Sequence, residues 1–357
     1  MSIIASVHGV VGDHRYPQAE LTASFAKIVS STGEEVPVIA RIHKATEVEY
    51  RSLALPLDAY SELGSFDASN DAFIRIGLEL GAQAIESALN EAGLNAIDVD
   101  FVMATSVTGV ATPSLEARLV PIVGFRPDVK RVPIFGLGCV AGAAGIARVH
   151  DYLLGHPDDV AVLLSIELCS LTLQSDDVSM ANIVASGLFG DGAAAVVMVG
   201  ERRAERMEIN GPRVISSRSR MYPDTEEMMA WNIGGSGFRI VLSASIGDVI
   251  AQHLGDDVDA FLSDEGLKAS EIERWVCHTG GPKVLQAIED SLNLHDGQLG
   301  PSWRSLAESG NLSSASVLHV LRDILEGRGV EKPKPGTPGL LLAMGPGFCS
   351  ELVLLEW

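Results

Sequence analysis

A weak internal duplication constrains the fold of this chain more than any other feature of its sequence. Residues 91–100, EAGLNAIDVD, resemble residues 264–273, DEGLKASEIE, at an offset of 173. Each segment follows a helical pattern and leads into an apolar strand, which ends near Thr105 in one copy and at His278 in the other. A repeated unit has to be recognised before a fold is assigned, so we expect two similar halves.

A second pair of matching segments places reactive side chains at equivalent points of these halves. Residues 138–140, Gly-Cys-Val, match residues 310–312, Gly-Asn-Leu, at an offset of 172, and each begins a helical pattern of small residues. Cys139 and Asn311 therefore stand at two related helix starts, and His278 stands at a strand end. In a two-fold related fold, these three side chains are expected to meet near the centre.

Apolar runs and helical periodicities predict an α/β protein. Helical patterns cover residues 71–92, 140–154, 246–262 and 283–292, and apolar runs predict strands at 100–105, 131–135, 160–166, 193–199, 275–278, 339–344 and 352–357. Strands without polar alternation are typical of sheets covered on both faces. We therefore predict an α/β/α/β/α layered fold with halves at 1–205 and 206–357, separated by a polar boundary at 201–223.

Composition excludes several classes of partner. The 357 residues include 26 Lys and Arg against 47 Asp and Glu, a net charge of −21, which disfavours nucleic acid and anionic membrane surfaces. No apolar run approaches the ~18 residues of a membrane span, and the first residues lack the basic region of a signal peptide. The four cysteines show no CxxC spacing, so we expect reduced thiols in a cytoplasmic protein.

Cys139 is the candidate nucleophile. A strand, a glycine-flanked turn and a small-residue helix place it at a helix N-terminus, where backbone N–H groups and the helix dipole favour an anion. We expect this position to lower the thiol pKa and to provide donors for an oxyanion on an acyl carbonyl. The alternative is an inert buried cysteine.

His278 and Asn311 each have a catalytic and a structural interpretation. A neutral His278 imidazole at a strand end is suited to take the thiol proton, which would give a thiolate–imidazolium pair. Its alternative is a histidine that caps a turn. An Asn before a helix is ordinarily an N-cap. Only the match of Asn311 to Cys139 in the duplication indicates that it lies near Cys139 at the centre of the fold.

Several ordered motifs then carry a resemblance over nearly the whole chain. The motifs are GCVAG at 138–142, LFGDGAAA at 188–195, YPDTE at 222–226, GFR at 237–239, HTGGP at 278–282, GNLSS at 310–314 and GPG at 345–347. Together they resemble the type III polyketide synthases, the chalcone synthase-like group of the thiolase superfamily. The segments at 222–226 and 237–239 resemble its bacterial alkylpyrone and alkylresorcinol synthases. The resemblance implies a duplicated thiolase-like fold and a homodimer.

The resemblance also implies roles. Cys139 would carry the starter acyl group and the growing chain, while His278 and Asn311 would bind the malonyl thioester carbonyl and stabilise the enolate. Phe189 and Phe238 would be aromatic gatekeepers between a CoA tunnel and a cavity. Acyl-CoA and malonyl-CoA would be substrates, an acyl carrier protein would be an alternative donor, and no metal or redox cofactor would be needed.

Further positions match the substrate-binding residues of that family. The predicted set is Thr108, Thr112, Glu167, Cys169, Thr172, Ser313, Gly345, Pro346 and Gly347, with Lys44 and Arg51 as CoA-binding cations. Small residues at 108, 169 and 172 leave room for an alkyl tunnel. The sequence-based expectation is therefore a fatty acyl starter, extended with malonyl-CoA and released as an alkylpyrone or alkylresorcinol.

Three other functions share part of this pattern. A ketoacyl synthase III-like enzyme has the same Cys, His and Asn, but the phenylalanine pair and the GPG loop favour the iterative type III class. A papain-like cysteine hydrolase uses the same three residue types in the same order. The mid-chain position of Cys139 and the duplicated core argue against it. An inactive structural homologue is disfavoured because Cys139, His278 and Asn311 are all intact.

Overall fold

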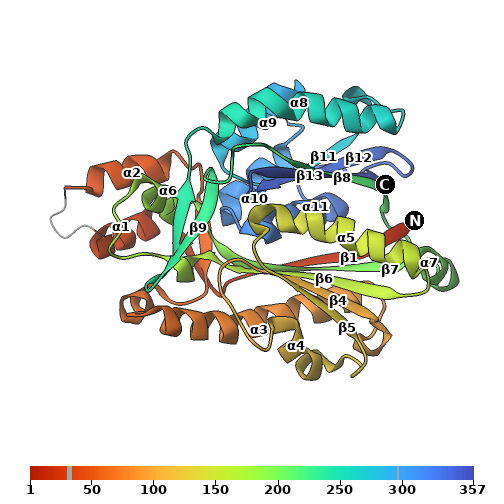
Figure 1. Ribbon diagram of the computed structural model, residues 1–357, viewed down its shortest axis with the longest axis horizontal. Coiled ribbons are helices and arrows are strands. Elements are labelled where there is room, and N and C mark those ends of the chain that lie inside the picture. The colour runs from red at the N-terminus through yellow and green to blue at the C-terminus, as the bar shows by residue number, and fades with distance from the viewer. Residues whose placement is uncertain (30–33, 296) are drawn as a thin grey trace.

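The computed structural model, which describes residues 1–29, 34–295 and 297–357, has five layers (Figure 1). In the view of Figure 1 the layers follow one another from bottom to top as helices, sheet, helices, sheet and helices. The helical layers contain α3 (Phe66–Glu91) and α4 (Leu115–Leu119), then α5 (Ala141–Gly155) and α11 (Ser316–Glu326), then α8 (Ile246–Asp264) and α9 (Pro282–Leu292). The predicted α/β/α/β/α arrangement is confirmed.

The sheet of the N-terminal half has the strand order β5-β4-β6-β7-β1. Its strands are β1 (Ser2–Val11), β4 (Phe101–Thr105), β5 (Lys130–Ile134), β6 (Val160–Leu168) and β7 (Asp191–Gly200). Strand β4 runs parallel to β5 and β6, whereas β7 is antiparallel to β6 and β1. Every residue of β6 and β7 is buried, because helices cover both faces of the sheet.

The sheet of the C-terminal half has the order β11-β12-β13-β8. Its strands are β8 (Arg213–Met221), β11 (Arg274–Cys277), β12 (Pro338–Gly345) and β13 (Cys349–Glu356). The two sheets are continuous at one corner, where Ser2 and Ile3 of β1 pair with Val214 and Arg213 of β8. Strand β8 and the helix α7 (Glu201–Met207) occupy the segment predicted as a polar boundary. Most side chains of β8 are polar and partly exposed, so no apolar run marks this strand.

The duplication is visible in the backbone. Helices α3 and α8 are both followed by a glycine at positive φ, Gly93 at 66° and Gly266 at 72°, then by a short 3-10 turn and a strand, β4 or β11. The glycines before the second matched pair, Gly138 and Gly310, also have positive φ, 58° and 71°. Glycine adopts this region without the steric cost that a Cβ brings, which explains why both copies keep it.

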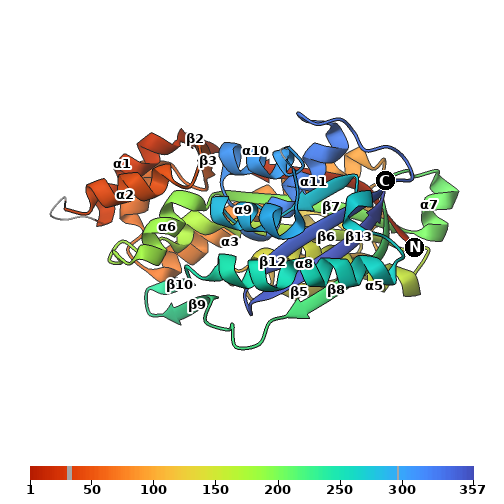
Figure 2. The same cartoon turned by 90° about the horizontal axis from the view of Figure 1, so that it is seen from above.

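The remaining elements gather at one end of the layers, on the left in Figures 1 and 2. They are β2 (His14–Pro17), α1 (Gln18–Val29), α2 (Val36–Lys44), β3 (Tyr50–Leu53), α6 (Met180–Leu188) and a two-stranded arm of β9 (Met229–Gly234) and β10 (Gly237–Leu242). Helix α10 (Gly300–Ser309) packs beside β3. Short helical turns complete the chain: η1 (Leu57–Glu62), η2 (Ala96–Asp98), η3 (Val120–Gly124), η4 (Gly138–Val140), η5 (Cys169–Thr172), η6 (Ala269–Glu271) and η7 (Ser313–Ala315).

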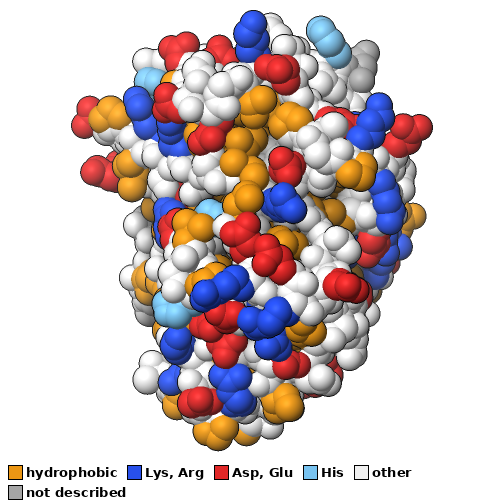
Figure 3. Space-filling model, turned by 90° about the vertical axis from the view of Figure 1, so that its right-hand side faces the viewer, with side chains coloured by type: hydrophobic (Ala, Val, Ile, Leu, Met, Phe, Trp, Pro, Cys, Tyr) orange, Lys and Arg blue, Asp and Glu red, His pale blue; other side chains and the backbone are white. Residues whose placement is uncertain are grey.

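The opposite end of the molecule carries both chain termini and α7. The space-filling view of this end shows acidic and basic side chains interspersed, with no field of one sign (Figure 3). Arg202 and Arg206 of α7, for example, both pair with Asp158. In the part of the chain that the structure describes, no helix is long and apolar enough to cross a membrane.

Candidate active site

Two adjoining cavities lie between the ends of the sheets and the cluster of α1, α2, α6 and the arm. The cysteine cavity, with a volume of about 120 Å³, contains Cys139. The histidine cavity, with a volume of about 360 Å³, contains His278 and Asn311. Phe189 and Met229 line both cavities and therefore stand at their boundary.

Cys139 lies in η4, directly before the buried helix α5, as the sequence predicted. Its side chain is almost fully buried, and its Sγ lies 3.7 Å from Ser313 Oγ. Burial raises the pKa of the Cys139 thiol to about 12, although hydrogen bonds from Ser313 and Asn311 oppose the rise. The prediction that the helix start lowers this pKa is therefore wrong, because loss of solvent outweighs the local contacts that favour the thiolate.

The backbone and the side-chain oxygen of Asn311 both accept or donate hydrogen bonds that fix its position. Its backbone N–H donates to Leu188 O at 2.9 Å, and its carbonyl accepts from the N–H of Gly190 at 3.0 Å, which seats it beside Phe189. Its Oδ1 accepts from the N–H of Ser313 at 2.8 Å. This oxygen therefore caps η7, and the amide NH₂ is left to donate toward Cys139.

His278 follows β11 and is held there by its backbone N–H, which donates to Leu342 O at 2.9 Å. The imidazole is buried, and burial lowers its pKa to about 3, so it is neutral near pH 7. Its Nδ1 is enclosed and has no hydrogen-bond partner among the described residues. A Cys139–His278 hydrogen bond is likewise not found among them, so the predicted thiolate–imidazolium contact does not exist in this state.

Glu167 lies behind the wall of the cysteine cavity. Its carboxylate is fully buried and accepts hydrogen bonds from Thr108 Oγ1 at 3.0 Å, from the N–H of Val107 at 3.2 Å and from Ser313 Oγ at 3.2 Å. Desolvation raises the pKa of Glu167, and these donors oppose that effect. The network orients Ser313, which in turn contacts the Cys139 thiol.

The structure places the predicted substrate-binding residues in two groups. Those that line the cysteine cavity are Arg51, Thr108, Cys169, Thr172, Phe189, Ser313 and Pro346. Those that do not line either cavity, among the residues that the structure describes, are Lys44, Thr112, Glu167, Phe238, Gly345 and Gly347.

Three of these positions have surroundings that the sequence did not indicate. Phe238 is buried against Trp231 and Phe66, with ring centroids 5.7 and 5.4 Å away, so it supports the wall rather than lining it. Arg51 is buried and donates to Phe189 O at 2.7 Å. Lys44 is exposed at the end of α2, next to the histidine cavity residue Ala45.

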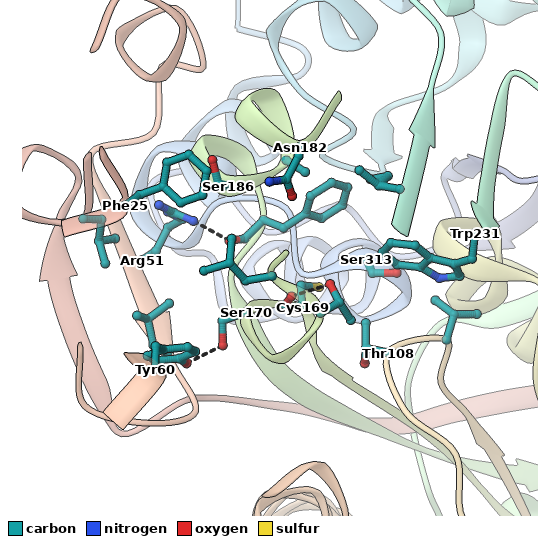
Figure 4. A pocket seen from close by; sticks show the side chains of 18 of the residues that line it. Phe25, Arg51, Tyr60, Thr108, Cys169, Ser170, Asn182, Ser186, Trp231 and Ser313 are labelled. Atoms are coloured by element: carbon teal, nitrogen blue, oxygen red, sulfur yellow. Dashed lines mark hydrogen bonds between the residues drawn. The ribbon is translucent and has the colours of Figure 1, made fainter. Parts of the chain in front are cut away.

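Sequence reasoning missed five polar residues of the cysteine cavity: Ser24, Tyr60, Ser170, Asn182 and Ser186. Two of them, Tyr60 and Ser170, contact each other. Their hydroxyl groups are 2.5 Å apart (Figure 4). Ser170 Oγ also donates to Asp191 Oδ2. The three residues are far apart in the chain and belong to η1, η5 and β7. Asp191 lies in the FGDG motif, but nothing local in the sequence links that motif to Tyr60.

Comparisons with known proteins identify the family. Residues 40–202 match the family described as "Chalcone and stilbene synthases, N-terminal domain", and residues 213–356 match its C-terminal domain. The chain is 54% identical over 354 residues to a 1,3,6,8-tetrahydroxynaphthalene synthase of Streptomyces peucetius, covering 99% of this chain and 93% of that one. It is 33% identical to a putative chalcone synthase of Bacillus subtilis, covering 95% and 94% of the two chains.

A solved structure is similar over the whole chain. The tetrahydroxynaphthalene synthase of Streptomyces coelicolor, a bacterial type III polyketide synthase, superimposes with a TM-score of 0.92 at 29% identity and covers 99% of both chains. The fold, the meeting of Cys139 with Asn311 and these matches define a condensing enzyme with a thiolase-like fold. The chain belongs to the chalcone and stilbene synthase family and is a type III polyketide synthase.

Proposed function

We propose that this enzyme condenses malonyl-CoA units on Cys139 and cyclises the chain to 1,3,6,8-tetrahydroxynaphthalene. The observation that carries the proposal is the 54% identity, over 99% of the chain, with a synthase named for that product. A naphthalene with four hydroxyl groups has ten carbons and no alkyl side chain. Five two-carbon units account for it, so a malonyl-derived unit would serve as the starter as well as the extender.

The first chemical step loads the starter. The sulfur of Cys139 attacks the thioester carbonyl, the bond from that carbon to the CoA sulfur breaks, and the thiol proton leaves with the CoA thiol. Because burial holds Cys139 as a neutral thiol, deprotonation accompanies substrate binding rather than preceding it. The Asn311 amide would donate to the developing charge. Ser313 Oγ, which accepts from the thiol and donates to Glu167, would have to turn its hydroxyl proton toward the sulfur to do the same.

Decarboxylation and condensation follow at the boundary of the two cavities. When the carboxylate of malonyl-CoA leaves as carbon dioxide, the electron pair of the broken C–C bond moves onto the thioester oxygen as an enolate. The Asn311 NH₂ and the neutral His278 imidazole would donate to this oxygen. The enolate carbon then attacks the acyl carbonyl on Cys139, a C–C bond forms, and the cysteine sulfur departs. This chemistry needs no metal or redox cofactor.

The lining of the cysteine cavity supports a poly-β-keto chain. Such a chain has a carbonyl on every second carbon, and each buried carbonyl requires a donor. The polar side chains on this lining are Ser24, Arg51, Tyr60, Thr108, Ser170, Thr172, Asn182, Ser186 and Ser313. Arg51, Thr108 and Asn182, for example, already bond within the protein. The lining therefore accommodates a poly-β-keto chain without excluding an alkyl chain.

A fatty acyl starter, with an alkylpyrone or alkylresorcinol as product, stays a second candidate. Most residues that α1 and its neighbours contribute to the cysteine cavity are apolar, namely Leu21, Phe25, Ile28, Leu57 and Leu173, whereas Ser24 of α1 is polar. Burial of an alkyl chain against them would contribute ~0.8 kcal/mol per methylene. An acyl carrier protein also stays an alternative donor to CoA.

A starter panel distinguishes the two candidates. Purified enzyme would receive malonyl-CoA alone, or with acetyl-, hexanoyl-, decanoyl-, palmitoyl- or coumaroyl-CoA, and products would be read by mass spectrometry. We expect tetrahydroxynaphthalene, or its oxidation product, from malonyl-CoA alone. Turnover that requires a decanoyl or palmitoyl starter would overturn the proposal in favour of the second candidate. Malonyl-acyl carrier protein in place of malonyl-CoA tests the donor.

We also expect a homodimer. Strand β5 ends the sheet and its outer edge is unpaired in the described residues, while Val132 and Phe135 near it are 37% and 50% exposed. An unpaired edge with apolar neighbours is ordinarily covered by another chain or element. Thr112, which is also exposed, would lie near the two-fold axis. Sedimentation velocity at micromolar concentration tests this, and a monomer would contradict it.

A further inference from the structure

A hydrogen-bonded chain leads from the cysteine cavity into the protein core. Tyr60 Oη lies 2.5 Å from Ser170 Oγ, and Ser170 Oγ donates to Asp191 Oδ2. Figure 4 shows the Tyr60–Ser170 contact at the rim of the cavity, and both residues line it. Asp191 is fully buried and does not line the cavity, but Ser170 links it to the cavity and, one step further, to Tyr60.

The inner end of the chain is fixed by backbone donors. Asp191 Oδ1 accepts from the N–H of Ser170 at 2.8 Å, and Oδ2 accepts from the N–H of Ala54 at 2.6 Å. Tyr60 Oη accepts from the N–H of Leu55 at 3.3 Å. Each hydroxyl therefore has an acceptor on one side and a donor on the other, the arrangement that lets a proton pass in either direction.

We propose that Tyr60, Ser170 and Asp191 form a proton relay that removes protons from the poly-β-keto chain, and returns them to it, during ring closure. Tyr60 is the catalytic residue that touches the chain, and Ser170 and Asp191 act through it. The proposal deepens the function proposed above and rests on it, because it presumes a polyketone in the cysteine cavity. None of these residues takes part in the loading and decarboxylation steps.

During one ring closure, every proton that the relay takes from the chain is returned to it. A methylene between two carbonyls gives its proton to Tyr60 Oη, Tyr60 gives its own proton to Ser170 Oγ, and Ser170 gives its own to the Asp191 carboxylate. The carbon is then an enolate, which attacks a ketone carbon and forms the ring bond. The ketone oxygen becomes an alkoxide and takes a proton back from Tyr60, and the same transfers run in reverse. Asp191 is again a carboxylate, and no proton is gained or lost.

The surroundings of Asp191 suit such a base. Desolvation raises its pKa to about 6, against the opposing donors from Ser170 and Ala54. The titratable groups that face it are Arg51 from β3, Tyr60 from η1 and Cys169 from η5. Arg51 favours the carboxylate and keeps it charged near neutral pH, while burial makes that carboxylate a stronger base than an exposed one.

The competing explanation is structural, because the same bonds also anchor residues 54–60. Tyr16 provides a matched control for it. Its hydroxyl accepts from the N–H of Leu57 at 3.2 Å, in the same segment, but in the described residues it neither lines a cavity nor contacts a carboxylate. A Tyr16→Phe variant therefore removes an equivalent anchor without touching the relay.

The test is a ratio measured in one reaction. Wild type, Tyr60→Phe, Ser170→Ala, Ser170→Thr and Tyr16→Phe would each receive malonyl-CoA, and ring-closed product would be counted per carbon dioxide released. General acid–base catalysis contributes ~10²–10⁴ in rate, so we expect the ratio to fall about tenfold or more in Tyr60→Phe and Ser170→Ala. Ser170→Thr keeps the hydroxyl and should restore the ratio, and Tyr16→Phe should match wild type.

The pH profile separates a relay from an anchor. In wild type the ratio should fall as the pH drops through about 6, where Asp191 takes up a proton, and in Tyr60→Phe it should not change there. Equal ratios in wild type, Tyr60→Phe and Ser170→Ala would overturn the relay, as would an equal fall in Tyr16→Phe.

If wild type releases lactones instead of the naphthalene, the proposed function fails. The ratio of lactone to carbon dioxide then tests the relay independently, since lactone closure also begins with loss of a proton.

Discussion

Asn311 combines two tasks at the residue scale because its amide has two ends. The oxygen accepts from the N–H of Ser313 at the start of η7, and the NH₂ group is directed toward the Cys139 thiol. Asn311→Asp keeps the acceptor and removes the donor, whereas Asn311→Ala removes both. Loss of one oxyanion donor typically costs ~10²–10³ in rate. We expect that fall in malonyl-CoA decarboxylation for both variants, with the melting temperature lowered mainly in Asn311→Ala. If Asn311→Asp decarboxylated malonyl-CoA at the wild-type rate, the donor role would be contradicted and only the structural role of Asn311 as a helix cap would remain.

The two cysteines of the cysteine cavity should behave differently with substrate. Cys139 and Cys169 are both buried, and burial raises the pKa of each, so general thiol reactivity does not single out one. Only Cys139 contacts Ser313 and Asn311, and both contacts favour its thiolate form. After incubation with an acyl-CoA, peptide mass spectrometry should find the adduct on Cys139 and lose it in Cys139→Ala. Retention of the adduct in that variant would contradict the assignment.

The sequence predicted those site residues that belong to short local motifs. It did not predict properties that depend on contacts between residues far apart in the chain. Cys139 and Asn311 were found because duplication and short motifs are local patterns. The direction of the Cys139 pKa shift was not predicted, because it depends on how completely the fold excludes water from the sulfur. The contact of Tyr60 with Ser170 joins residues 110 positions apart, and neither residue belongs to a motif.

The arm of β9 and β10 is the element that closes the cysteine cavity. Met229, Ala230, Trp231 and Ile240 reach the cavity from it. Gln174 Nε2 ties the arm down by donating to Ser236 O at 3.2 Å and to Phe238 O at 3.1 Å. The sequence did not predict this arm, because a two-stranded ribbon outside the main sheets has no continuous apolar run to mark it.

Trp231 should limit the size of the acyl chain that the arm admits. Trp231→Ala opens space at the cavity wall, and each methylene that becomes buried there is worth ~0.8 kcal/mol, about fourfold in kcat/KM. In competition assays with malonyl-CoA, we expect the relative kcat/KM of hexanoyl- and decanoyl-CoA to rise by about that factor for each methylene that becomes buried. Ile233→Ala, on the same strand at a 61% exposed position, is the control and should keep the wild-type preference. An unchanged preference in Trp231→Ala would show that the arm does not set chain length.

At the scale of the whole molecule, the duplication accounts for where the site lies. Each half buries one central helix, α5 or α11, against both sheets, and their N-terminal turns carry Cys139 and Asn311. The layered fold could be predicted from the sequence, because apolar runs indicate strands that are buried on both faces. The sequence did not predict the end of the molecule formed by α1, α2, α6 and the arm. The elements there are short and partly exposed, and they are ordered by packing on the layers.

Three of the four buried histidines have strongly lowered pKa values and should make the whole fold sensitive to acid. Burial lowers the pKa of His43 to about 4 and those of His278 and His319 to about 3, against 6.5 in the unfolded chain. Between these values the folded state binds fewer protons than the unfolded state, so stability is complete above pH 6.5 and is lost as the pH falls. At pH 5 each histidine should cost about 2 kcal/mol relative to pH 7.

Buried carboxyl groups oppose this trend but do not cancel it. The pKa of Asp191, raised to about 6, returns about 1 kcal/mol of stability by pH 5, and burial shifts the pKa values of Glu167 and Glu351 in the same direction. We therefore expect the free energy of unfolding, measured by urea titration, to fall by a few kcal/mol from pH 7 to pH 5. His319→Gln should reduce that fall by about 2 kcal/mol, because a glutamine can keep the contact to Ala193 O without titrating. His156→Gln, at an exposed position, is the control and should leave the fall unchanged. An identical pH dependence in His319→Gln and wild type would show that this buried imidazole does not contribute to the acid sensitivity.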